Sequence, residues 1–180
     1  SSDPDDIPTD NGKSRTIMPR ANTIVFVGDS LTVGMSQAVS GITTYAKVGQ
    51  TVWQGYDAYA NQIVAAKPST VVISYGTNDA GYNNATKFVS SYKKFIKKLK
   101  DGIPNVKIYI SKIFPGDASK SGVTSNGKAC INGIPALNNK LAEIATEGAT
   151  VIDSTNIPNL KTYYSNDGIH FNSNFYKLWY

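Results

Sequence analysis

The chain contains few of the residues that form disulfides and metal centres. Cys130 is its only cysteine and His170 its only histidine. A lone cysteine excludes an internal disulfide. One cysteine with one histidine also leaves no Cys/His zinc cluster, because structural zinc takes four such ligands. The sequence therefore predicts neither a disulfide framework nor a structural zinc site.

Long apolar runs are also missing. No stretch approaches the roughly 20 apolar residues that a membrane-spanning helix needs, and the first residues lack the charged-then-apolar pattern of a signal peptide. The 180 residues, of which 41% are hydrophobic, are enough for one domain with one core. We expect a single folded domain with no membrane span.

Acidic residues are outnumbered, with 13 Asp and Glu against 18 Lys and Arg and a net charge of +5. Such a balance suits an acidic partner, either nucleic acid or a polyanionic polysaccharide. Many of the lysines, however, fall between residues 87 and 100, where apolar residues recur at helical spacing. We interpret them as the solvent face of an amphipathic helix. They are not interleaved with aromatic residues on a recognisable nucleic-acid-binding fold, so no nucleic acid is expected as partner.

Residues 1 to 22 have the composition of a linker or disordered tail, with acidic residues, prolines, Asn and Ser and few apolar residues. The folded domain is expected over residues 23 to 180. Within it, residues 115 to 129 are rich in Gly, Ser, Lys and Asn. This loop is long enough to be either a mobile rim of a site or plain surface.

From residue 23 onward, short β-branched runs alternate with helical patterns. Strands are predicted at 23–27, 70–74, 106–111 and 150–153, with a weaker one at 43–48. Helices are predicted at 30–38, 54–66, 86–100 and 135–146, where Pro135 suits a first helical turn. The alternation predicts an α/β fold, a three-layer α/β/α sandwich with a central parallel sheet of about five strands. Ligands on such sheets bind beyond the carboxyl ends of the strands.

The first strand is followed by Gly28-Asp29-Ser30-Leu31-Thr32. A serine hydroxyl at this turn faces out from the sheet edge, and the amide groups of the helix N-terminus can stabilise an oxyanion. Asp29 or Ser30 can equally be an ordinary helix cap, because both are preferred cap residues. This segment alone favours the cap.

Two further polar segments lie in comparable places. Asn78, in the run after the strand at 70–74, can turn its side-chain amide toward the same oxyanion, or it can belong to an ordinary turn. Asp167 precedes His170 by three residues, close enough for both to act in one local turn. A serine nucleophile needs a base, and the base needs a partner that fixes its tautomer.

Together, three blocks closely resemble those of the SGNH (GDSL) hydrolase family, in the family's order and over residues 23 to about 176. They are Gly28-Asp29-Ser30-Leu31, Gly76-Thr77-Asn78-Asp79 and Asp167-Gly168-Ile169-His170. The resemblance implies a flavodoxin-like SGNH hydrolase fold and a serine esterase that needs no metal or organic cofactor. It implies Ser30 as nucleophile, His170 as base and Asp167 as the partner of the base, with an oxyanion hole formed by Ser30, Gly49 and Asn78.

The assignment of Gly49 is the least direct, because the block that carries this glycine departs from the family pattern at Gln50. Gly55 is a rival that falls within a predicted helix, and Gly49 can also be a turn residue with positive φ. About ten residues follow His170, where the family usually closes with a longer helix. The last helix is therefore either unusually short or trimmed.

The expected substrate is a small acyl ester, with a short acyl group, favoured to be acetyl, on a carbohydrate or polysaccharide. A domain of this size has no room for a lid and a long acyl tunnel. Candidate substrate-binding residues are Asp29 beside the nucleophile and four aromatic residues near strand ends, which can stack on sugars or simply pack: Trp53, Tyr75, Tyr82 and Phe114.

Two other functions stay open: an acetyltransferase acting on cell-wall glycans and a non-catalytic glycan-binding module. The composition suits a secreted or cell-surface bacterial enzyme, and the oligomeric state is left open. Because His170 must be neutral to act as a base, activity is expected to fall below about pH 6.5.

Overall fold

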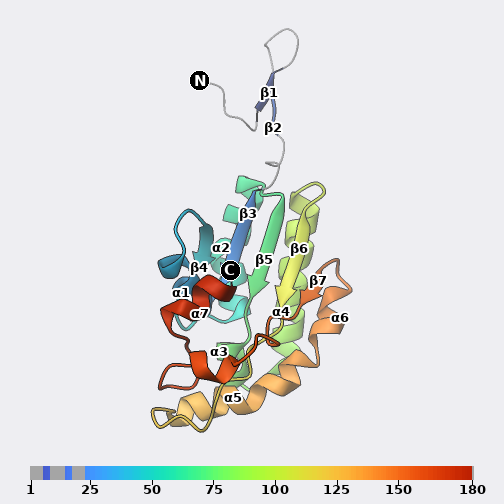
Figure 1. Cartoon of the computed structure of the whole chain (residues 1–180). Coiled ribbons are helices and arrows are strands. Elements are labelled where there is room, and N and C mark those ends of the chain that lie inside the picture. Colours follow the sequence, from blue (N-terminus) through green and yellow to red (C-terminus); the bar gives the residue numbers. More distant parts are fainter. Residues whose placement is uncertain (1–5, 9–14, 18–22, 180) are drawn as a thin grey trace.

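Five parallel strands form the central sheet. The computed structural model describes residues 6–8, 15–17 and 23–179. The strands of this sheet are β3 (Ile24–Gly28), β4 (Thr43–Ala46), β5 (Thr70–Ser74), β6 (Lys107–Ser111) and β7 (Thr150–Ile152). They pair in parallel in the order β4-β3-β5-β6-β7 (Figure 1). This order is the flavodoxin-like one, so the predicted fold class is confirmed.

The strand order reverses between β3 and β5, which is the topological switch point of the sheet. The chain runs from β3 outward to β4 and then returns to β5 on the other side of β3. Open α/β sheets bind ligands beyond the carboxyl ends of the strands at such a switch point. The segments that follow β3, β4 and β5 are therefore the ones to examine for a site.

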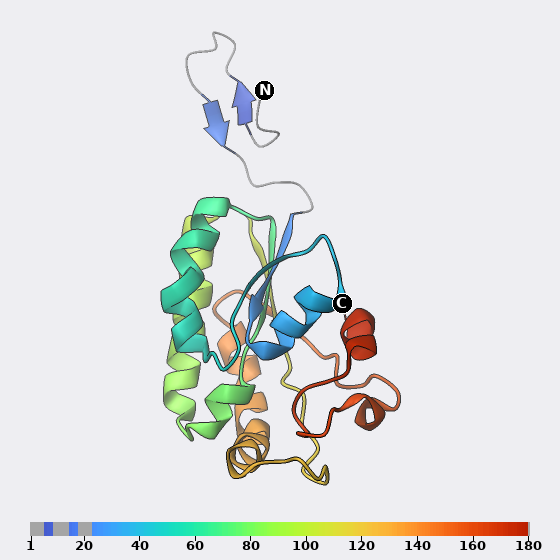
Figure 2. The same ribbon diagram turned by 90° about the vertical axis from the view of Figure 1, so that its left-hand side faces the viewer.

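Helices cover both faces of the sheet. On one face lie α1 (Ser30–Ala38) and α7 (Ser173–Trp179), and on the other lie α2 (Val52–Ala66) and α4 (Ala85–Gly102) (Figure 2). The amphipathic interpretation of the lysine-rich segment is confirmed, because α4 buries its apolar residues while most of its lysines face outward. The buried set is Phe88, Tyr92, Phe95, Ile96 and Leu99.

Two apolar cores hold these layers together. The larger core fills the space between the sheet and α2 and α4, with Val71 and Ile73 of β5 fully buried in it. The smaller core is largely aromatic and joins α1 to α7 and to the loop before α7. In it the rings of Phe171 and Phe175 stack at 3.8 Å, and Phe114 meets both edge-on. The segment that carries His170 is thus anchored by aromatic packing against α1.

The helix predicted at 135–146 is wrong in its start. The structure has α5 (Ser125–Asn138), with Pro135 inside it, followed by α6 (Leu141–Ala145). The Thr124 side chain caps α5 by accepting a hydrogen bond from the Gly127 amide at 3.0 Å. Helix α5 tolerates the proline because Ile134 and Leu137 beside it are buried in the core. The last five residues of the predicted 115–129 loop are therefore helical.

Short elements complete the chain. Helix α3 (Thr77–Gly81) and the 3₁₀-helix η1 (Leu160–Tyr163) follow no pattern long enough to predict them. Strands β1 (Asp6–Pro8) and β2 (Arg15–Ile17) pair antiparallel. The linker predicted for residues 1 to 22 otherwise lies outside the described residues and stays a prediction. No helix in the described ranges has the length and apolar content to cross a membrane.

Candidate active site

Ser30 begins helix α1 immediately beyond the carboxyl end of β3. Asp29 is the helix cap, since its Oδ1 accepts a hydrogen bond from the Leu31 amide at 3.1 Å, and its side chain is buried. Gly28 allows the tight turn, because a Cβ there would lie 2.6 Å from the Ser74 carbonyl oxygen. Capping by Asp29 leaves the Ser30 hydroxyl free for another partner.

That partner is His170. Ser30 Oγ lies 2.7 Å from His170 Nε2, across 140 residues of sequence. On the far side of the imidazole ring, His170 Nδ1 is hydrogen-bonded to Asp167 Oδ2. The three residues predicted as a triad therefore form one hydrogen-bonded chain. The imidazole side chain remains 41% exposed, so a substrate can reach it.

The Asp167 carboxylate is held as an anion. Burial acts to raise its pKa, but hydrogen bonds from the His170 ring and from the backbone amides of Ile169 and His170 outweigh burial and lower the pKa to about 2. Both amides donate to Oδ1 at 2.9 Å. Asp167 is thus ionised throughout the neutral range and can stabilise a protonated imidazole.

Gly49 and Asn78 line one surface hollow, together with Gly81, Tyr82, Asn126 and Cys130. Gly49 has φ +77°, a left-handed conformation that suits glycine. Its rival Gly55 is buried in α2, where a Cβ would lie 2.0 Å from the Tyr75 hydroxyl, so that glycine serves packing. The two predicted oxyanion donors from separate loops are therefore neighbours in space.

Residues 75 to 79 fasten the loop that carries Gly49. The Asn78 side chain donates to the Gln50 carbonyl at 3.3 Å, and Asp79 Oδ2 accepts from the Val52 amide at 2.7 Å. The Tyr75 hydroxyl donates to the Gln50 side chain at 2.8 Å. Asp79 and Tyr75 therefore position the candidate oxyanion loop. This positioning role was not predicted from the sequence, although Asp79 stands in the block that carries Asn78.

The sequence profile of the GDSL-like lipase/acylhydrolase family matches residues 26–178. The chain belongs to this family. No curated protein matches it in sequence. Among solved structures it is similar to a GDSL-like lipase from Bacteroides thetaiotaomicron, with 18% identity, a TM-score of 0.67, and coverage of 86% of this chain and 82% of that one.

Two carbohydrate esterases share the fold. An acetyl xylan esterase aligns with 18% identity and a TM-score of 0.66, over 86% of this chain and 94% of that one. A carbohydrate esterase of family 3 from Talaromyces cellulolyticus aligns with 18% identity and a TM-score of 0.64, over 87% of this chain and 91% of that one. At these identities the likeness establishes the fold of the GDSL acylhydrolase and no more.

The loop after β6 is tied to the segment that carries Asp167 and His170 in this GDSL acylhydrolase. The Asp117 amide donates to the Gly168 carbonyl at 2.7 Å, and the Gly122 amide donates to the Asn166 carbonyl at 2.9 Å. The Gly116 amide donates to the Tyr164 hydroxyl at 2.8 Å. Residues 116 to 122 therefore support the candidate base from outside and are not an independent lid.

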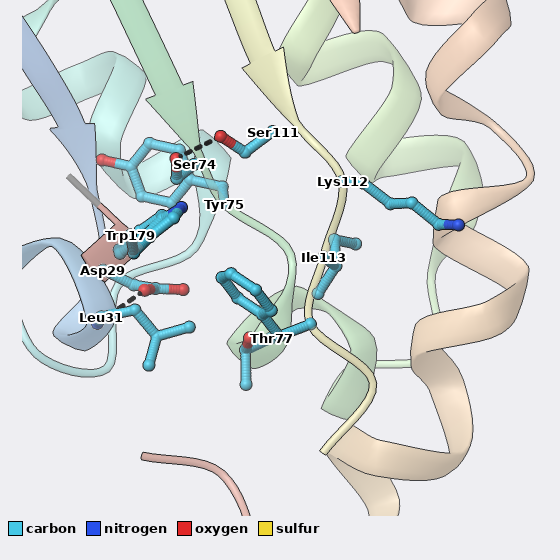
Figure 3. A pocket seen from close by; sticks show the side chains of 10 residues that line it. Asp29, Leu31, Ser74, Tyr75, Thr77, Ser111, Lys112, Ile113 and Trp179 are labelled. Carbon is cyan, nitrogen blue, oxygen red and sulfur yellow. Dashed lines mark hydrogen bonds between the residues drawn. The ribbon is translucent and has the colours of Figure 1, made fainter. Parts of the chain in front are cut away.

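Three predicted substrate-binding residues are buried, which corrects those assignments. Tyr75 and Phe114 are only 2% and 4% exposed, because they pack in the two cores, and Asp29 is 1% exposed. All three line a pocket whose wall includes Leu31 and Trp179, and Figure 3 shows Asp29 and Tyr75 beside it. This pocket shares no lining residue with the surface hollow of Gly49 and Asn78, so the two are separate, and neither Ser30 nor His170 lines either of them.

Burial also perturbs two carboxyl groups beneath the site. It raises the pKa of Asp29 to about 7, and the neighbouring Asp79 carboxylate adds to this shift. Burial likewise raises the pKa of Asp79 to about 7. No group of three or more His, Cys, Asp or Glu side chains in the described part of the chain is placed to hold a metal ion.

Trp53 and Tyr82 keep the exposure that substrate contact requires. Tyr82 is 62% exposed and meets the half-buried Trp53 edge-on, with ring centroids 5.4 Å apart. The Lys87 ammonium lies 4.4 Å above the Trp53 ring. Because Tyr82 also lines the hollow with Gly49 and Asn78, the aromatic pair continues outward from the candidate oxyanion site.

Proposed function

We propose that the protein is a serine esterase in which Ser30, His170 and Asp167 form the catalytic triad. The observation that carries this proposal is the hydrogen-bonded chain from Ser30 Oγ through the imidazole to the Asp167 carboxylate. In the tautomer that fits this chain, Nδ1–H donates to Asp167 and Nε2 accepts the Ser30 hydroxyl proton. The base is thus oriented toward the nucleophile before substrate arrives.

In the first half of the reaction, Ser30 Oγ attacks the ester carbonyl while His170 takes its proton. The negative charge that develops on the carbonyl oxygen is stabilised by the amides of Ser30 and Gly49 and by the Asn78 side chain. Asn78 has two N–H donors, of which one bonds the Gln50 carbonyl, so the other is available to the oxyanion.

Collapse of the tetrahedral intermediate breaks the bond to the alcohol oxygen, which takes the proton from His170. The product is an acyl group on Ser30 and a free alcohol. Water then attacks this acyl-enzyme with His170 again as base, which releases the carboxylic acid and restores the Ser30 hydroxyl.

We infer that the substrate is a short acyl ester, favoured to be acetyl, on a carbohydrate. Two structural neighbours are esterases of carbohydrates by name, one of them acting on acetyl xylan. The exposed pair of Trp53 and Tyr82 beside the hollow supports sugar stacking. An acetylated polysaccharide as substrate would suit a secreted or cell-surface enzyme.

Hydrolysis of p-nitrophenyl acetate, butyrate and octanoate tests the proposal, with Ser30→Ala beside the parent chain. The matched control is Ser36→Ala on the same helix, because the Ser36 hydroxyl donates to the Val33 carbonyl and takes no part in the proposed triad. Acetate should be cleaved best, with activity lost in Ser30→Ala and kept in Ser36→Ala. Equal activity of Ser30→Ala and the parent chain would refute the triad.

Two further measurements separate the alternatives, one with an added sugar acceptor and one with an acetylated glycan. Retention of the acetyl group on an added sugar acceptor, in place of its release to water, would identify a transferase. Binding of acetylated glycan without turnover in the parent chain would identify a binding module.

A further inference from the structure

The exposed surface beside the surface hollow of Gly49 and Asn78 continues as far as helix α4. Tyr82 belongs both to the wall of the hollow and to the aromatic pair with Trp53. Trp53 in turn is covered by the Lys87 ammonium at 4.4 Å. The hollow, two aromatic rings and one cation therefore form an unbroken path leading away from the candidate oxyanion donors.

Among the described residues, no carboxylate neutralises the charge at the end of this path. Lys93, Lys97 and Lys112 each lie within 3.5 Å of a carboxylate oxygen. In the described part of the chain, Lys87 instead has the Trp53 ring as its partner, and its side chain is exposed. A ring face holds an ammonium group in place without cancelling its charge, so the charge remains available to an anion.

The surroundings of Lys87 favour an anion further. Lys87 lies in the first turn of α4, where the positive end of the helix dipole adds to its own charge. Asp79, which positions the oxyanion loop, is buried, and burial raises its pKa to about 7, whereas the exposed Asp57 lies one helical turn along α2 from Trp53. Asp79 therefore repels an anion less near neutral pH than an exposed carboxylate would.

We propose that Tyr82, Trp53 and Lys87 form a subsite for a negatively charged sugar, so that the natural ester is carried on an anionic glycan. This inference rests on the proposed esterase function. The rings contact the apolar face of the sugar, and Lys87 binds its carboxylate or phosphate. The nearby Gly49 and Asn78 then bind the carbonyl oxygen of an ester on a neighbouring sugar unit of the same glycan.

The first test compares kcat/KM on an acetylated polyuronate with kcat/KM on neutral acetylated xylan at low salt. The parent chain should prefer the polyuronate, and Lys87→Gln should lower that preference roughly 2- to 5-fold, the range expected of one exposed cation. Raising the salt to about 0.5 M, where the Debye length is near 4 Å, should weaken the preference in the parent chain.

Lys94→Gln is the matched control. Lys94 lies on the same helix and its ammonium covers the Tyr56 ring at 4.7 Å, but it lies seven residues, or about two helical turns, beyond Lys87. The Lys94→Gln substitution removes the same charge and the same type of cation–π contact, but at a position away from the hollow. Equal effects of both substitutions, or no preference for the polyuronate in the parent chain, would overturn the subsite.

Failure of the esterase proposal can be told apart from failure of the subsite. If the parent chain cleaves no ester, binding of oligouronates and of glycerol-phosphate oligomers to Ser30→Ala is measured by calorimetry, with and without Lys87→Gln. Lys87-dependent binding would support the subsite, and the better ligand would show whether carboxylate or phosphate is recognised. Absence of binding by both oligomers would overturn it.

Discussion

Replacement of Asp29 by Asn should make the protein more stable at neutral pH and abolish part of the pH dependence of its stability. Asp29 is 1% exposed, and burial raises its pKa from 3.8 to about 7. Between these values the folded chain binds a proton that the unfolded chain has released. The contribution of Asp29 to stability therefore falls as pH rises from about 4 to about 7 and stays low above that.

The magnitude follows from the size of the shift. At about 1.4 kcal/mol for each pKa unit, the interval from 3.8 to about 7 corresponds to at most roughly 4 kcal/mol of destabilisation at pH 8. Asn caps helices about as well as Asp, so Asp29→Asn keeps the hydrogen bond from Leu31 and removes only the buried charge. The gain in free energy of unfolding should approach that value at pH 8 and vanish near pH 4.

Urea unfolding followed by tryptophan fluorescence at pH 4 to 8 measures the difference. Asp57→Asn, at an exposed position of α2, is the control and should parallel the parent chain at every pH. Asp167 acts in the opposite sense, because its lowered pKa gives stability that is lost only as pH falls from about 4 toward 2. Parallel pH curves for Asp29→Asn and the parent chain would refute the assignment of a destabilising buried charge.

Three predictions concern the rate. Asn78→Ala should lower kcat by about 100- to 1,000-fold with little change in KM, since it removes an oxyanion donor, and a loss confined to KM would contradict that role. Asp167→Asn should lower kcat by about 10⁴-fold, because it removes the partner that fixes the imidazole tautomer. In the parent chain, titration of Asp167 should not cause any loss of kcat between pH 5 and 8, because its pKa of about 2 lies below that range. Tyr164→Phe should leave the partly buried Gly116 amide without its acceptor and should lower kcat on p-nitrophenyl acetate without changing KM. An unchanged kcat would show that the loop does not position the candidate base.

The sheet was predictable because its inner strands are continuous β-branched runs. Both faces of β3 and β5 are covered by helices, so Val27, Val71 and Ile73 could be recognised without any alternation of polar residues. The site was predictable for a related reason. In a parallel sheet, polar segments that follow strands meet at one edge, however far apart they lie in the sequence.

The burial of single aromatic residues could not be predicted in this way. Phe114 is buried because Phe171 and Phe175, more than fifty residues later, pack against it. Tyr75 is buried because the neighbouring helix has Gly55, with no side chain, opposite its ring. Local sequence contains neither partner, so proximity to a strand end was a poor guide to exposure. The start of helix α5 was mispredicted at Pro135 for a similar reason, since tertiary packing outweighed the local preference of proline for a helix start.

The ties between residues 116–122 and the segment of His170 distinguish two regions around the candidate site for anyone redesigning the enzyme. A Cβ on Gly122 would lie 2.7 Å from the Asn166 carbonyl oxygen, and one on Gly168 would lie 2.2 Å from the Asp117 carbonyl oxygen. Libraries or insertions placed there would displace the base along with the loop. Among the described residues, the exposed turn at Tyr82 and Asn83 has backbone hydrogen bonds to Asp79 and Ala80 of its own segment and none to the segment of His170, so specificity can be varied there without displacing the candidate base.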